Sequence, residues 1–250
     1  MPPQERKEPR LLTPAAAAEL MATGHVEVVD RLAHSSNATF LVTCGRDNAQ
    51  VTAVYKPVAG ERPLWDFPSD SLFRREVAAY ELSRWLRWDL VPTTVGREAG
   101  PLGPGSMQLF IEHDPEQHYF SLMNSRRRVF RRLAFFDLLA NNADRKSGHC
   151  IVDRAGRIWA IDHGLTFHED PKLRTVIWDF AGESLPAVER RAAARLVAAL
   201  EDGRSEIASV LATLLDPAEV RGLAQRAASL AAGGRFPSPA SSWSFPWPLV

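Results

Sequence analysis

Apolar and polar positions alternate through the first part of the chain in the pattern of a small sheet preceded by a short helix. Thr13-Pro14 and the alanine-rich run after it predict a capped helix that ends at Gly24. The period-two alternation that follows is typical of short strands separated by polar turns. Three strands are expected here, over residues 25–29, 37–43 and 50–55. Residues 1–12 are polar and contain prolines, which predicts a loose arm.

From residue 71 on, the spacing of the apolar residues changes from the period of a strand to that of a helix. Residues 71–88 carry apolar side chains at 73, 77, 80, 82 and 86, which predicts a helix with one buried face. Two further strands are expected over 90–95 and 106–112. The Gly- and Pro-rich segment 99–105 is predicted to be the turn between them.

The second half of the chain is mainly helical in pattern. A helix is expected over 126–140, and residues 186–232 have the spacing of two or three more. Between these regions, the short apolar runs 150–152 and 158–161 flank a polar turn and predict a β-hairpin. Residues 233–250 are rich in Pro and Ser but contain several aromatic side chains. That composition favours either an extended arm across the body or a partner-binding segment.

Charge and composition narrow the class of protein. Lys plus Arg and Asp plus Glu both number 30, so the net charge is zero, whereas a general nucleic-acid binder shows a basic excess. The balance also gives no support for attraction to anionic lipids. Hydrophobic residues make up 45% of the 250, enough for one large domain or for two lobes with a cleft between them.

The cysteines and the N-terminus suggest a cellular compartment. Cys44 and Cys150 lie in apolar settings outside any Cys-x-x-Cys pair, which favours buried free thiols in a reducing environment. The N-terminal residues are charged and lack the apolar core of a signal peptide. No apolar run approaches the ~20 residues of a spanning helix. A cytoplasmic protein without stable membrane insertion is expected.

Residues 141–167, NNADRKSGHCIVDRAGRIWAIDHGLTF, hold the main cluster of candidate chemistry. Phosphotransfer enzymes use D-x-x-x-x-N, then a hairpin, then D-x-G, because a transferring phosphoryl group spreads charge over several oxygens. Asp144 is therefore the candidate base, and Arg145 beside it is a second catalytic candidate. His149 and Asp162 are candidates for holding a divalent metal ion.

These residues resemble the corresponding region of phosphatidylinositol 3-/4-kinases and of HipA-type kinases. A closer resemblance is to a family of small actinobacterial proteins with a phosphatidylinositol-kinase-like domain, and it covers most of residues 24–182. The shared stretches include AVYKP, GERPLWDFP, LVPTTV, GPLGPGSMQLF, ANNADRKSGHC and IDHGLTFH. The chain departs from the larger kinase families at three positions. His149 replaces a metal-binding Asn, Lys146 replaces His, and His163 replaces Phe.

The resemblance implies an α+β, two-lobed protein-kinase-like fold. The N-lobe, residues 1–112, would contain an antiparallel sheet with a helix. The C-lobe, residues 113–232, would be mainly helical with a catalytic β-hairpin, and residues 233–250 would form the tail. It also implies ATP-dependent phosphotransfer, without fixing a lipid substrate. Manganese or magnesium is expected as the metal, and the imidazole of His149 would suit manganese better.

Two residues of the first lobe match the kinase pattern. Lys56 ends the strand Ala53-Val54-Tyr55-Lys56-Pro57, which resembles the V-A-I-K strand whose Lys contacts the nucleotide phosphates. Glu76, in the first half of the helix expected over 71–88, would pair with Lys56 and hold it there. Glu81 on the same helix is the alternative partner.

The remaining nucleotide contacts are predicted from position. Ser35, Ser36 and Asn37 occupy the turn where a protein kinase has its Gly-rich loop, and they either contact phosphates or form a plain hairpin turn. Gln108, Phe110 and Ile111 lie in the segment that would meet adenine through main-chain hydrogen bonds.

The leading hypothesis is an ATP- and divalent-metal-dependent phosphotransferase. The same fold transferring AMP, or a pseudokinase that binds nucleotide as a scaffold, are the alternatives. The acceptor is expected to be a protein, the chain itself or a small soluble molecule. His168, Lys172, Arg174 and the arginines of residues 126–132 are candidates for contact with it. The tail serines are candidates for self-phosphorylation: Ser238, Ser241, Ser242 and Ser244.

Overall fold

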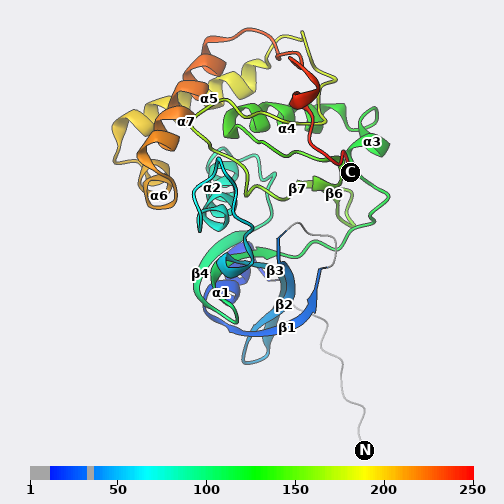
Figure 1. Ribbon diagram of the computed structural model, residues 1–250, viewed down its shortest axis with the longest axis vertical. Helices are drawn as coiled ribbons and strands as arrows, with labels where there is room; N and C mark the ends of the chain where they lie inside the picture. Colours follow the sequence, from blue (N-terminus) through cyan, green and yellow to red (C-terminus); the bar gives the residue numbers. More distant parts are fainter. Residues whose placement is uncertain (1–11, 33–36) are drawn as a thin grey trace, which may run out of the picture.

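The computed structural model describes residues 12–32 and 37–250, which form two lobes (Figure 1). The N-terminal lobe is built on a five-stranded antiparallel sheet in the order β1-β2-β3-β5-β4. The strands are β1 (His25–Arg31), β2 (Phe40–Arg46), β3 (Ala49–Pro57), β4 (Thr94–Gly100) and β5 (Gly103–Leu109). This sheet and the helical second lobe with its hairpin confirm the predicted fold class.

A short helix closes one face of the sheet. Helix α1 (Pro14–Thr23) begins after Thr13, whose side chain accepts a hydrogen bond from the backbone N–H of Ala16 (3.2 Å). Met21 of this helix packs with apolar side chains of the sheet in a small core of its own. Burial of these side chains fixes the sheet as a platform for the residues at the end of β3.

Strands β4 and β5 extend into the Gly- and Pro-rich segment that was predicted to be a turn. Their pairing runs as far as Gly100 opposite Gly103, so only two residues remain between the strands. Gly100 makes this close pairing possible, because a Cβ there would lie 2.7 Å from the carbonyl oxygen of Gly103. At the other end, Leu90 lies outside the strand that was expected to contain it, and its N–H donates to Ser83 Oγ (2.8 Å).

Helix α2 (Leu72–Trp85) lies between the sheet and the second lobe (Figure 1). It is fixed to the second lobe by Arg75, whose guanidinium is 1% exposed. Arg75 Nε donates to the carbonyl of Thr166 (2.9 Å), and its terminal nitrogen pairs with Glu219. A residue on α2 is therefore held in a set position relative to both lobes.

The second lobe surrounds a large apolar core. Its helices are α3 (Tyr119–Leu122), α4 (Arg127–Ala140), α5 (Ala187–Asp202), α6 (Glu206–Leu214) and α7 (Pro217–Ala232), and its hairpin strands are β6 (Cys150–Val152) and β7 (Ile158–Ala160). Helix α4 contributes Phe130, Leu133, Phe135 and Phe136, each at most 1% exposed. It ends at Asn141 in the left-handed region (φ 53°), which turns the chain toward the hairpin.

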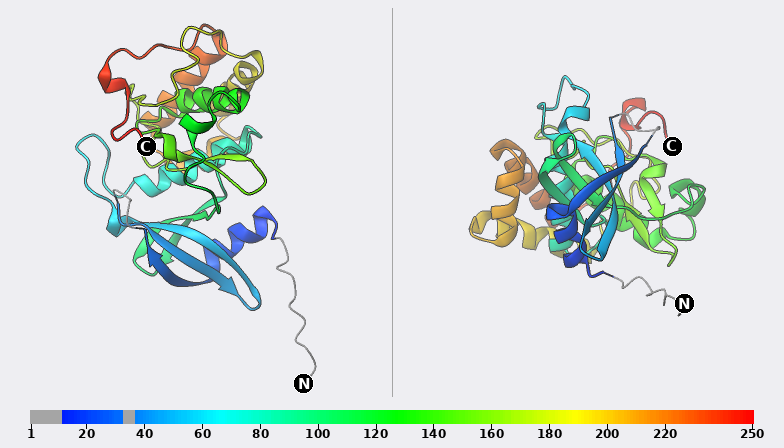
Figure 2. Two further views of the ribbon diagram at one scale, coloured as in Figure 1. Left: turned by 90° about the vertical axis from the view of Figure 1, so that its right-hand side faces the viewer. Right: turned by 90° about the horizontal axis from the view of Figure 1, so that it is seen from below.

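The last residues form an extended arm across the second lobe. Phe236 is buried against Phe180, and its backbone exchanges hydrogen bonds with Gly182 and Glu183. The segment then turns toward the hairpin and ends beside it at the boundary of the lobes (Figures 1 and 2). There the N–H of Ser147 donates to the carbonyl of Leu249 (2.8 Å). One of the two predicted interpretations of residues 233–250, an arm across the body, describes this path.

Two expectations about thiols and membranes can be compared with the structure. Cys44 and Cys150 are both free and buried, as expected. Within residues 12–32 and 37–250, no helix has the length and apolar character that crossing a bilayer requires.

The buried pair between Arg75 and Glu219 gives a stability prediction. Glu219→Gln keeps the shape of the side chain but leaves the Arg75 charge buried without its partner, so the free energy of unfolding should fall by about 3 kcal/mol. Denaturant unfolding measures the change. Glu206→Gln, which removes the partner of Arg84 in an exposed pair, is the control and should cost under about 1 kcal/mol. Equal costs for the two variants would contradict a structural role for the Arg75–Glu219 pair.

Candidate functional site

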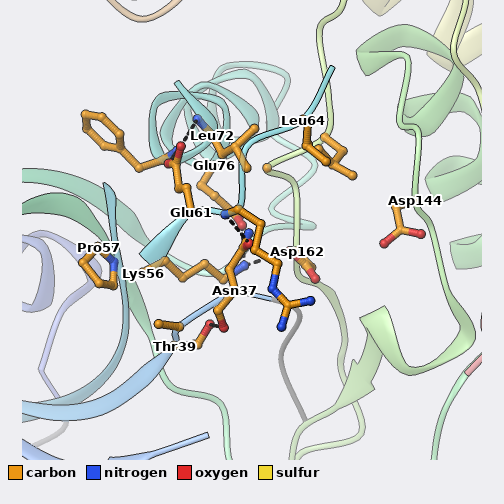
Figure 3. Close-up of a pocket in the computed structure, with 15 residues that line it drawn as sticks. Asn37, Thr39, Lys56, Pro57, Glu61, Leu64, Leu72, Glu76, Asp144 and Asp162 are labelled. Carbon is orange, nitrogen blue, oxygen red and sulfur yellow. Dashed lines mark hydrogen bonds and ion pairs between the residues drawn. The ribbon is translucent and has the colours of Figure 1, made fainter. Parts of the chain in front are cut away.

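Lys56 stands at the centre of the candidate site. It lies at the end of β3, where its Nζ contacts a carboxylate oxygen of Glu76 and lies 2.9 Å from Asp162 Oδ1 (Figure 3). Burial alone would lower the pKa of Lys56, but the two carboxylates raise it above its ordinary value. The ammonium group is therefore firmly charged, as a contact for phosphate oxygens must be.

Glu76 uses both oxygens to join three segments of the chain. One oxygen contacts Lys56, and the other accepts a hydrogen bond from the backbone N–H of His163 (2.9 Å). Its side chain is 3% exposed. The alternative partner, Glu81, instead pairs with Arg84 at the surface. Of the two candidate glutamates, the structure places Glu76 beside Lys56.

Asp162 follows the hairpin and faces the same space as Lys56. Its backbone is in the left-handed region (φ 60°), and its Oδ2 lies 3.2 Å from His149 Nε2. Burial acts to raise the pKa of the Asp162 carboxyl, but the charge of Lys56, with a smaller effect of His149, holds it well below its ordinary value. The side chain keeps 45% exposure, so an ionised carboxylate is presented toward solvent in the cleft.

His149 points toward Asp162, from the 3₁₀ turn Ser147–His149. Burial lowers the pKa of its imidazole to about 4, so the ring is neutral at pH 7. Its Nδ1 faces the backbone N–H of Lys146 (3.4 Å), which fits a ring that carries its proton on Nε2 and donates it to Asp162. The contact between His149 and Asp162 is then a hydrogen bond rather than an ion pair.

The donor set fits a divalent cation that takes its other ligands from phosphate and water. Among the described residues, no three His, Cys, Asp or Glu side chains gather into a site that would hold an ion alone. Asp162 offers a carboxylate of the kind that magnesium and manganese bind. Nε2 of His149 can join it if the ring proton moves to Nδ1, which gives up the hydrogen bond from the N–H of Lys146. Asn142 is not available, because its amide bonds to Asp137 and to the N–H of Asp144.

Asp144 lines the same pocket from the far side of the cleft (Figure 3). Its Oδ2 is 3.4 Å from Nζ of Lys146, a residue that the sequence analysis did not place in the site. Burial raises the pKa of Asp144 to about 6; Lys146 opposes the rise and the charge of Asp162 adds to it. A carboxyl that titrates near neutrality is suited to accept a proton from a hydroxyl group.

Arg145, predicted as a catalytic residue, is buried and does not line the pocket with the other candidates. Its guanidinium is fully buried, with a terminal nitrogen 2.9 Å from Asp137 Oδ1. It also donates to the carbonyl of Ile161 (2.8 Å) and to Nε2 of His163 (2.7 Å). Arg145 therefore ties helix α4, the loop that follows it and the segment after the hairpin together. The sequence signal for this network was Asp137, a lone carboxylate within the apolar run FFDLLA.

The remaining residues predicted to contact the nucleotide differ in whether they line the pocket. Ser35 and Ser36 lie outside the described residues. Asn37 lines the pocket, and its Oδ1 accepts a hydrogen bond from the backbone N–H of Arg62 (3.0 Å). Gln108 pairs with Val54 and so lies on the same face of the sheet as Lys56, but its amide nitrogen donates to Thr94 Oγ1 on the neighbouring strand (2.9 Å).

Phe110 and Ile111 follow β5, on the segment that joins the lobes. The N–H of Phe110 donates to the carbonyl of Thr52 (3.0 Å), which continues the sheet ladder by one residue. The carbonyl of Ile111 bonds to the ring of His113 (2.8 Å). Both residues stay predictions as adenine contacts.

Two candidates for acceptor contact instead hold a loop in place. Nζ of Lys172 pairs with Asp66 (2.9 Å), and the ring of His168 bonds to the carbonyl of the same residue (2.8 Å). These contacts fix residues 60–71, the GERPLWDFP segment and its continuation, against the segment after Asp162. Residues 60–71 therefore cover one side of the pocket and are called its roof below. The sequence pattern alone did not reveal this covering segment.

The arginines at the start of α4 are mostly engaged in ion pairs. Arg127 and Arg131 pair with Glu183, and Arg132 pairs with Glu189 (2.9 Å). These contacts connect α4 to the segment before α5 and to α5 itself. They favour a structural role for this cluster over docking of an acidic acceptor.

The sheet order, α2, the hairpin and the facing carboxylates define a protein-kinase-like fold. Solved structures share it: a hydra Fam20 structure with sugar has a TM-score of 0.56 at 13% identity, over 87% of each chain. The Golgi casein kinase has a TM-score of 0.57 at 14% identity, over 88% of this chain and 76% of that one. Its structure with Mn and ADP bound has a TM-score of 0.52 at 15% identity, over 88% and 74%.

Sequence similarity shows to which family the chain belongs. No protein-family model matches it. Protein Rv2133c of Mycobacterium tuberculosis (strain ATCC 25618 / H37Rv) is 36% identical over 264 aligned positions, which cover 92% of this chain and 94% of that protein. The chain belongs to the same family as Rv2133c.

The raised pKa of Asp144 can be measured in the metal-free protein. Carbon-13 NMR of the aspartate carboxyls should give Asp144 a titration midpoint of about 6. In Asp162→Asn the midpoint should fall, because a neighbouring negative charge that opposes ionisation is removed. A midpoint near the ordinary ~3.9 in the unaltered protein would contradict the burial of this carboxyl.

Proposed function

We propose that the protein is a phosphotransferase that uses ATP and a divalent metal ion. The observation that carries this proposal is the contact of Lys56 with both Glu76 and Asp162, opposite Asp144 in one pocket. A lysine fixed by a helix glutamate, a carboxylate after the hairpin and a carboxylate in the loop before it are the parts that phosphoryl transfer requires. The fold shared with the Golgi casein kinase, which has been solved with Mn and ADP, supports the same conclusion.

Each residue has a role that follows from its surroundings. Lys56 would bind phosphate oxygens, and Glu76 would orient it. Asp162 and His149 would hold the cation, which when bound neutralises charge on the triphosphate. Asp144 would accept the proton of the acceptor hydroxyl as the new O–P bond forms. Lys146 lies near Asp144 and adds positive charge on that side of the cleft.

Catalytic turnover tests the proposal. Purified protein is incubated with ATP and Mn²⁺ or Mg²⁺, and the products are identified by mass spectrometry. Release of ADP together with a phosphorylated product supports phosphotransfer. Release of pyrophosphate with an AMP-modified product would instead show AMP transfer by the same fold. Nucleotide binding without turnover would indicate a pseudokinase.

Substitutions of the two carboxylates that contact Lys56 should differ in effect. Asp162→Asn removes a group that binds the cation and should lower turnover by about 10³-fold. Glu76→Gln only weakens the positioning of Lys56 and should cost about tenfold. Turnover with saturating ATP measures both, and Glu81→Gln, altered on the same helix at the surface, is the control with full activity. Equal, slight losses from both site variants would mean that the residues are misassigned.

The choice of metal should depend on His149. An imidazole nitrogen suits manganese better than magnesium, which prefers oxygen ligands and water. Manganese should therefore support turnover at a lower concentration than magnesium, and His149→Asn should reduce that preference. Titration of both ions at pH 7, where the ring is neutral, measures it. His25→Asn, at an exposed histidine, is the matched control. An unchanged manganese-to-magnesium ratio in His149→Asn would exclude His149 as a ligand.

A further inference from the structure

A pocket of about 310 Å³ opens onto Asp144 and Asp162 (Figure 3). Its volume is roughly ten times the ~30 Å³ that a water molecule occupies in the liquid. Leu64, Leu72 and other apolar side chains line part of it. It is therefore large enough for a small organic molecule, placed next to the candidate base.

Part of the pocket lies beyond the phosphate end of the proposed nucleotide site. The segment predicted to meet adenine adjoins Thr52, because Phe110 bonds to that residue. Lys56 is four residues farther along β3, about 13 Å at the rise of a strand. The pocket begins at Lys56 and continues past Pro57 to Glu61. The pocket therefore shares Lys56 and Asp162 with the proposed phosphate and metal site, and the part lined by Pro57, Glu61 and Leu64 lies beyond the residues assigned to the nucleotide.

Hydrogen bonds and an ion pair hold the roof of the pocket to its surroundings. The Glu61 carboxylate accepts a hydrogen bond from the N–H of Phe73 at the start of α2 (3.1 Å). The N–H of Arg62 donates to Asn37, which joins the roof to the start of the sheet. Asp66 is held by Lys172 and His168. A pre-formed pocket binds a ligand with little ordering cost.

Four carboxylates and two cations line the pocket, a net charge of −2 that a bound divalent cation would offset, so a neutral ligand adds no unbalanced charge. Lys56 is paired with Glu76 and Asp162, and Asp144 is the candidate base. The two further charged lining residues are Glu61 and Arg62, which have opposite signs. Together with the amide of Asn37 they offer both hydrogen-bond donors and acceptors, as a molecule with several hydroxyl groups requires.

The other approach to Asp144 is covered by the chain itself. Ser147, three residues after the candidate base, bonds to the carbonyl of Leu249 in the C-terminal arm. A Cβ added at Gly148 would lie 4.0 Å from a methyl group of Val250. An extended protein acceptor that followed the catalytic loop would have to displace this arm, whereas a small molecule in the pocket would not.

We propose that the acceptor is a small neutral molecule with several hydroxyl groups, bound in the pocket between residues 60–71 and Asp144. This proposal rests on the proposed function. In the reaction, an acceptor oxygen forms a bond to the γ-phosphorus of ATP, and the bond from that phosphorus to the oxygen of ADP breaks. The acceptor proton passes to Asp144.

Binding of hydroxyl-rich probes tests the proposal without requiring turnover. Glycerol, D-ribose and D-glucose are titrated separately into the full-length protein with Mg²⁺ and a non-hydrolysable ATP analogue, and saturation-transfer NMR reports binding. At least one probe should bind, and its Kd should rise about tenfold in Arg62→Gln, which removes a charged hydrogen-bond donor. Leu64→Trp, which fills the pocket, should also weaken binding. Arg46→Gln is the matched control on the far side of the sheet, with an unchanged Kd.

The outcomes separate this proposal from the proposed function. Binding of none of the probes, or equal binding in the Arg62→Gln and control variants, would overturn the acceptor assignment. Phosphate transfer from ATP to casein but to none of the probes would also overturn it, while leaving the phosphotransferase proposal intact. Probe binding in a protein that fails to turn over ATP would overturn the proposed function, and with it the role of this molecule as acceptor.

Discussion

The contact between Lys56 and Glu76 is the interaction on which the arrangement of the site depends. A carboxylate that is almost fully buried requires partners for both oxygens, and Glu76 finds them in Lys56 and in the N–H of His163. The three segments that meet there are the end of β3, helix α2 and the residues after β7. Because Asp162 directly precedes His163, the same contacts set the position of the candidate metal ligand relative to Lys56.

Helix α2 is not free to move away from this contact. Arg75 lies one residue before Glu76 and is bound to Thr166 and Glu219 of the second lobe. Arg145 provides a second buried cation that holds the loop of Asp144 against Asp137 and His163. Two buried arginines thus fix the two halves of the site relative to each other.

The sequence could predict which residues lie together where that depends on local spacing. Asp144, His149 and Asp162 follow from their distances along one short stretch, and Lys56 and Glu76 follow from a strand end and the next helix. Long-range partners leave no such pattern, which is why Arg145 was expected in the cleft although it is buried against Asp137. Lys172 holds residues 60–71 over the pocket, and Ser147 holds the end of the C-terminal arm. Both contacts join segments more than a hundred residues apart. The shifted ends of β4 and β5 reflect glycines that allow close pairing where composition indicates a turn.

Nucleotide binding tests the central claim, that Lys56 and its two carboxylates form a phosphate-binding centre. Isothermal titration calorimetry with ATP and Mg²⁺ should give a measurable Kd for the unaltered protein. Lys56→Met should weaken it by about tenfold or more, since a charged contact to phosphate is lost. Arg46→Met, at an exposed arginine of β2, should bind as the unaltered protein does. Failure of the unaltered protein to bind ATP, or equal affinity in Lys56→Met, would contradict the account.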